Sequence, residues 1–164
     1  MQVVKSVQQA YTPSQNLLDL LELFRRMLNH CVRIGLAENT TSMKSLSLKA
    51  YRQLAQYNTP SYYELCAISK AAGILSNYRK TARKKRRVKE PYAWKLQLVT
   101  CYGFKIKNGE LLLPLKPGRS VNILLNHHTV SILSQLDQTV RSVALTEETV
   151  EIAFSRNQVR CLPI

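Results

Sequence analysis

The sequence predicts an α+β protein in which a block of helices interrupts a small β-barrel. Apolar residues recur at helical spacing between positions 13 and 89, whereas short apolar segments separated by turn residues fill positions 90–157. A valine-bearing extended segment at 2–11 precedes the helices and is positioned to close an OB-like barrel with the C-terminal strands. We therefore expect a barrel domain of residues 1–11 and 90–157, a helical domain of residues 12–89, and a frayed tail at 158–164.

The first helix is predicted to begin at Thr12-Pro13 and to end near Leu36. Thr12 is a residue type that caps helices, and proline suits a first helical turn. Gly35 and Asn39 supply the stop signals, because both residue types favour the left-handed backbone found at helix ends.

Two further helices complete the predicted block. A Ser/Thr-rich connection leads to a shorter helix near 44–56, and the sequence Thr59-Pro60-Ser61 restarts the helical pattern. The third helix is expected to carry the basic residues of positions 79–89 in its last turns. Those cations would then project from a rigid arm.

The C-terminal half is predicted to be mostly β. Asn108-Gly109 is the strongest hairpin signal in the chain, because both residues tolerate the positive φ of a two-residue type I′ turn. A hairpin is therefore expected at 104–114. A short helix is also expected at 128–136, and strand-like segments are expected at 92–95, 98–107, 110–115, 120–124, 140–146 and 149–155.

Positive charge is concentrated in the middle of the chain. The net charge is +14, and residues 41–89 hold twelve basic and one acidic residue, which is about +11 of that total. Positions 79–89 alone carry eight basic residues in eleven positions. Such a local excess attracts phosphates and releases their counterions on contact, so nucleic acid is the leading candidate partner.

The candidate interface comprises cations and interleaved polar or aromatic residues. Phosphate contacts are expected from Arg79, Lys80, Arg83, Lys84, Lys85, Arg86, Arg87 and Lys89, with Lys44, Lys49, Arg52 and Lys70 as a second row. Base or stacking contacts are candidates at Tyr51, Tyr62, Tyr63, Ser69, Asn77 and Tyr78, where packing into the core is the competing role for each tyrosine.

Other chemistry has little support in the sequence. The four cysteines lie 30 or more residues apart, without a metal-ligand pattern, and are expected to be reduced. The ten acidic residues form no cluster that would hold catalytic metal ions, and His127-His128 has no recognisable catalytic partners. We expect no metal, no cofactor, no small-molecule substrate, no membrane span and no enzymatic activity, with the protein inside the cell.

The order of short phrases resembles the N-terminal half of the TnpB (OrfB) transposon proteins. Those phrases are Asn29-His30-Cys31-Val32 in the first helix, Ser61-Tyr62-Tyr63 opening the third, Ser76-Asn77-Tyr78-Arg79-Lys80 near its end, the segment 103–114, and the segment 140–154. The similarity extends over about residues 3–157. This family comprises RNA-guided DNA nucleases related to type V CRISPR effectors. Its archaeal members especially end their third helix with a phrase similar to residues 76–80, so the resemblance implies a prokaryotic cytoplasm.

The resemblance implies a β-barrel wedge domain interrupted by a helical recognition domain. Together these would grip a structured guide RNA and the short DNA motif that flanks the target. In the family a RuvC-like nuclease and a zinc ribbon follow, whereas this sequence ends at Ile164 before either. The resemblance therefore implies RNA and DNA as partners, and a separate nuclease subunit or a full-length relative as a further one.

Two other functions remain open at this point. One is a stand-alone DNA-binding regulator that uses the same basic surface without a guide RNA. The other is an assembly protein whose basic segment docks on an acidic partner. The chain itself would be a fragment, a truncated natural protein or one part of a split effector.

Overall fold

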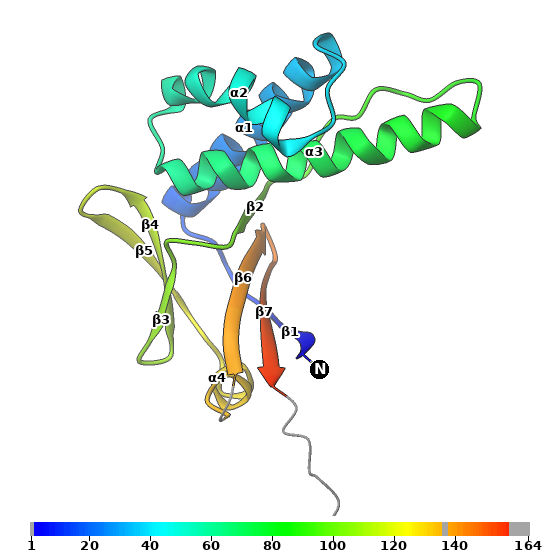
Figure 1. Ribbon diagram of the computed structural model, residues 1–164. Helices are drawn as coiled ribbons and strands as arrows, with labels where there is room; N and C mark the ends of the chain where they lie inside the picture. Colours follow the sequence, from blue (N-terminus) through cyan, green and yellow to red (C-terminus); the bar gives the residue numbers. More distant parts are fainter. Residues whose placement is uncertain (1, 136–137, 158–164) are drawn as a thin grey trace, which may run out of the picture.

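The computed structural model describes residues 2–135 and 138–157 of the chain. A layer of helices lies across one end of two antiparallel sheets (Figure 1). The helical elements are α1 (Gln15–Ala37), α2 (Met43–Leu54), a 3-10 turn η1 (Ala55–Tyr57), α3 (Ser61–Lys84) and α4 (His127–Leu133). The strands are β1 (Gln2–Ala10), β2 (Gln97–Thr100), β3 (Lys105–Lys107), β4 (Glu110–Lys116), β5 (Arg119–Leu124), β6 (Gln138–Thr146) and β7 (Thr149–Asn157).

The predicted α+β class is confirmed. One sheet has the strand order β1-β7-β6-β2 and the other the order β3-β4-β5. The N-terminal strand pairs with the last strand in antiparallel register, from Gln2 opposite Asn157 to Ala10 opposite Thr149. The long helices are thus inserted between β1 and β2, as the sequence pattern indicates.

The strands do not close into a barrel within the described residues. The expected strand at 98–107 is divided, because residues 101–104 bend away after β2. The Thr100 hydroxyl holds this bend: it donates to the carbonyl oxygen of Tyr102 at 2.7 Å and accepts from the Tyr102 N–H at 3.3 Å. Gly103 then takes a positive φ of 79°. As a result β2 ends the first sheet and β3 begins the second.

The hairpin at Asn108-Gly109 is confirmed. Lys107 pairs with Glu110 across it, and φ is 52° at Asn108 and 75° at Gly109, as a type I′ turn requires. The strands expected near 110–115, 120–124, 140–146 and 149–155 are present, and so is a short helix close to the expected 128–136. The strand expected at 92–95 is absent. The tail at 158–164 lies outside the described residues.

The first helix begins slightly later than expected and ends close to the expected Leu36. It begins after Ser14 rather than at Thr12-Pro13, and the Ser14 carbonyl accepts the first helical hydrogen bonds. Gly35 does not stop the helix. It lies inside α1 where α3 crosses, and a Cβ there would sit 2.1 Å from the Leu75 Cδ1 atom. Asn39 does follow the helix with a left-handed φ of 48°.

One continuous cluster of buried apolar side chains joins the helices to both sheets. Tyr63 on α3 is completely buried, and its hydroxyl donates to the carbonyl oxygen of Pro114 on β4 at 2.7 Å. The helical layer is therefore packed on the sheets. None of the helices in the described part of the chain is long and apolar enough to cross a membrane.

Candidate nucleic-acid interface

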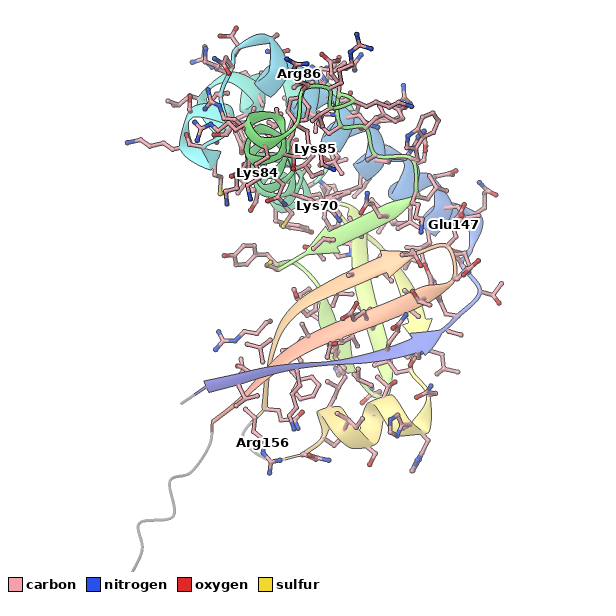
Figure 2. All side chains as sticks on the ribbon, turned by 90° about the vertical axis from the view of Figure 1, so that its right-hand side faces the viewer. Lys70, Lys84, Lys85, Arg86, Glu147 and Arg156 are labelled. Carbon is pink, nitrogen blue, oxygen red and sulfur yellow. The ribbon has the colours of Figure 1, made fainter. Side chains whose placement is uncertain are left out.

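The cationic segment, residues 79–89, begins on α3 and continues beyond it. Arg79, Lys80, Arg83 and Lys84 occupy the last turns of the helix, whose final buried residue is Leu75. This end of α3 extends past the other helices (Figure 1). Figure 2 looks at the molecule from that side and shows Lys84, Lys85 and Arg86 around the end of the helix.

The prediction that the whole run is helical is wrong. Lys85 has an extended backbone (φ −124°, ψ 140°), so the helix ends at Lys84 and the following residues turn back. Beyond Leu75 no buried apolar side chain holds the helix to the core. Like charges spaced four residues apart, such as Lys80 and Lys84, destabilise a helix that packing does not support.

The result is a cationic segment with two kinds of backbone. We call residues 85–96, which lead from α3 back to β2, the strap. In Figure 1 the strap forms a long loop at the projecting end of α3 and returns over the helical layer. Four of the eight cations stand on the helix and four, Lys85, Arg86, Arg87 and Lys89, on the strap.

These cations are available to an external anion. Lys80 and all of the basic residues from Arg83 to Lys89 are exposed. The ion pairs in the described part of the chain are Arg25–Glu22 and Lys49–Glu38, and neither involves the cationic segment. Its charge is therefore not neutralised within the protein.

Arg79 differs from its neighbours because it is half-buried and held in place. Its guanidinium donates to the Asn39 side-chain oxygen at 3.0 Å. Asn39 is the left-handed residue that follows α1, so the bond ties the end of α1 to α3. Arg79 and Tyr78 line a pocket between these two helices, together with Thr40 and Glu90.

The residues expected as a second row of phosphate contacts differ in exposure and in their partners. Lys44 and Arg52 are exposed on α2, which packs against α3. Lys49 pairs with Glu38 at the surface, where such a pair contributes little stability. Lys70 is half-buried and donates to the Gln97 side chain on β2, and burial lowers its pKa. It connects α3 to the first sheet.

The candidate base-contacting residues fall into two groups. Tyr51, Ser69 and Asn77 are exposed. Tyr63 is a core residue, and Tyr62 and Tyr78 are half-buried. The ring of Tyr62 lies edge-on to Tyr63 at a centroid distance of 4.9 Å. Of the two roles considered for each tyrosine, base contact and packing into the core, Tyr63 therefore has the second.

A cleft that the sequence analysis did not anticipate lies between the start of α3 and the turn joining β4 to β5. Lys116 and Arg119 flank that turn and are exposed, and Gly118 between them has φ 76°. The cleft is lined by Asn58, Thr59, Pro60, Ser61, Tyr62, Pro114, Lys116, Pro117, Gly118, Arg119 and Ser120. The two cations flanking Pro117-Gly118 are the sequence signal that would have located it.

The strap is anchored to α1 by a buried side chain, which the sequence pattern did not reveal either. Asn29 is 7% exposed. Its amide nitrogen donates to the Ala93 carbonyl oxygen at 3.0 Å, and its side-chain oxygen accepts from the Ala93 N–H at 2.8 Å. Arg25 donates to the same carbonyl oxygen at 3.5 Å. The segment expected to be a strand at 92–95 is thus fixed by a side chain instead.

The residues considered for other chemistry are dispersed. Across residues 2–135 and 138–157, no three His, Cys, Asp or Glu side chains gather as they would around a metal ion. His127 and His128 are exposed at the start of α4. Cys31, Cys66 and Cys101 are free thiols, the first two buried and the third exposed, and Cys161 lies outside the described residues.

Comparison with known proteins adds no family assignment. No protein-family model matches the sequence, and no curated protein matches it. The resemblance to the TnpB proteins remains a prediction from the short phrases described above.

Proposed function

We propose that this protein is a nucleic-acid-binding module of a TnpB-like RNA-guided system. The cationic segment would contact the phosphates of a structured RNA, and the helical layer with the two sheets would act as the recognition and wedge parts that hold this RNA beside flanking target DNA. Catalysis would belong to a separate nuclease subunit or a full-length relative, with all of them in the cytoplasm.

One observation carries the proposal. Eight cations within eleven residues stand at a projecting end of the helical layer, and no acidic side chain of the described chain pairs with them. Such a surface has a strong positive potential, which a polyanion neutralises with release of its counterions. Lys116 and Arg119 extend positive charge to the cleft beside the start of α3.

The test is binding of the purified protein to structured RNA, single-stranded DNA and duplex DNA across a salt series, after any co-purifying nucleic acid has been sequenced. Because each phosphate contact adds about 0.7–0.9 to the log–log slope, a slope of about −4 or steeper corresponds to about five contacts. We expect such a slope with a preference for RNA. Neutralising the basic residues of 83–87 should abolish most of the RNA binding.

Other outcomes would favour the alternatives. A preference for duplex DNA of one sequence, with no RNA bound, would support a stand-alone DNA-binding regulator. Indifference to all three nucleic acids would overturn the proposal and leave the assembly protein with an acidic partner. Unchanged RNA binding after neutralisation would remove the cationic segment from the interface.

A further inference from the structure

The strap presents two large aromatic side chains to solvent. Trp94 is 79% exposed and Tyr92 is 52% exposed, and their rings meet edge-on with centroids 4.9 Å apart. A tryptophan contributes a large apolar surface, which a folded protein ordinarily buries at least in part. This pair lies in the same segment as Lys85, Arg86, Arg87 and Lys89.

The backbone between the two rings is held by contacts that do not involve the rings. Ala93 separates them, packs against the core, and is bound at both of its backbone polar groups by the buried Asn29 side chain. The residues on either side of Ala93 are instead mostly exposed, Tyr92 at 52% and Trp94 at 79%. With Ala93 directed at the core, Tyr92 and Trp94 are directed outward.

The charge around the pair identifies the kind of partner. Lys89 lies five residues before Trp94, so its backbone is within about 18 Å even in a fully extended chain. Lys95 directly follows Trp94 and is exposed. Exposed aromatic rings interleaved with unpaired cations are the arrangement by which proteins hold single strands: the cations contact phosphates and the rings stack on bases.

We propose that Tyr92 and Trp94 form a stacking platform for an unpaired base of a nucleic-acid strand whose phosphates contact the strap. This inference rests on the proposed nucleic-acid-binding function and specifies the form of its ligand. Bases within a duplex are already stacked on each other, so the platform would select single-stranded segments. The double hydrogen bond of Asn29 holds the platform ready before the strand binds.

Trp94 is the single tryptophan of the chain, so its fluorescence reports on this site alone. The experiment is a titration of the whole protein with an oligonucleotide of about 16 nucleotides, either single-stranded or paired with its complement. Anisotropy of a dye on the oligonucleotide measures binding in the same samples. We expect both forms to bind, but only the single strand to quench the Trp94 emission.

Substitutions separate stacking from other effects. Trp94→Ala should weaken single-strand binding about 5- to 150-fold and leave duplex binding unchanged, whereas Trp94→Phe should retain most of the affinity. Tyr102→Ala is the matched control, because Tyr102 is 65% exposed but lies outside the strap. It should bind both forms as the unchanged protein does.

The result distinguishes this inference from the proposed function on which it rests. If single strands bind with unchanged Trp94 emission and Trp94→Ala binds equally well, the platform is refuted and nucleic-acid binding stands. If neither the single strand nor the duplex binds, the platform and the proposed nucleic-acid-binding function are both refuted. Equal losses for Trp94→Ala and Tyr102→Ala would also refute the platform, because the effect would not be specific to the strap.

Discussion

The ring of Tyr62 covers Gly103 so closely that any side chain at position 103 would have to displace it. A Cβ atom at position 103 would lie 2.4 Å from the Tyr62 Cζ atom. Tyr62 stands at the start of α3 and Gly103 in the bend between the two sheets. The contact therefore sets the place where the helical layer meets the junction of the sheets.

We predict that Gly103→Ala is more destabilising than the same change at Gly118. Both glycines have a similar positive φ, 79° and 76°, which costs an alanine roughly 1–2 kcal/mol. Only Gly103 also has a neighbour that must move, which adds about 1–3 kcal/mol, whereas Gly118 has no atom within 4 Å of its added Cβ. Urea unfolding of both variants measures the difference. An equal loss of unfolding free energy in the two variants would mean that Tyr62 moves aside freely.

Asn29→Ala should release the strap from α1. The change removes both hydrogen bonds to Ala93, at a cost of about 1–3 kcal/mol. Hydrogen exchange at the Ala93 amide, which donates to Asn29, should become about tenfold faster or more. The control is Asn122→Ala, which removes an exposed hydrogen bond to Glu110. Its unfolding free energy should stay within about 0.5 kcal/mol of that of the parent protein. Unchanged exchange at Ala93 would show that the strap is held by other contacts.

Stability should fall between pH 10 and 12, in part through Tyr11. Burial, followed by the nearby Glu147 carboxylate, raises the pKa of Tyr11 from 10.0 to about 12. Its hydroxyl donates to the Thr146 carbonyl oxygen at 2.6 Å. Because the folded state keeps this proton to higher pH than the unfolded state, the contribution is complete below pH 10 and is lost as pH rises to about 12.

The variant Tyr11→Phe isolates that contribution. It should lower stability at neutral pH by about 1 kcal/mol, because the hydrogen bond is lost. It should also have a shallower decline of the unfolding free energy between pH 10 and 12. A decline as steep as in the parent protein would show that Tyr11 does not titrate differently on folding.

The two halves of the cationic segment should contribute separately to the salt dependence of binding. Replacing Lys80, Arg83 and Lys84 by glutamine tests the helical half, and replacing Lys85, Arg86 and Arg87 tests the strap. Each triple variant should reduce the log–log slope by about 2, at about 0.7 per phosphate contact to a single strand. The measurement is affinity for the preferred nucleic acid across the salt series.

A control with the same change in net charge uses Lys5, Lys105 and Lys107, which are exposed on β1 and β3. Its slope should stay within about 0.5 of that of the parent protein. If the control lowers the slope as much as the strap variant does, overall charge, rather than the cationic segment, governs binding.

The sequence by itself determined the elements whose causes are local. Asn108-Gly109 produced its hairpin because two adjacent residues that tolerate positive φ suffice for that turn. Apolar periodicity located the helices, and the density of cations at 79–89 needs no fold to be recognised. The pairing of the N-terminal strand with the C-terminal strands was also expected, as the closure of a small barrel. The pairing is present, although the described strands form two sheets rather than a barrel.

Tertiary structure alone decided the features that depend on contacts between distant residues. Gly35 has the local character of a helix stop, but its lack of a side chain serves the close approach of Leu75, 40 residues away. Residues 92–95 have the aromatic character of a strand, yet Asn29 binds the backbone that a neighbouring strand would otherwise pair. The helix ends at Lys84 because packing beyond Leu75 does not offset the repulsion of its cations, and packing is a property of the whole fold.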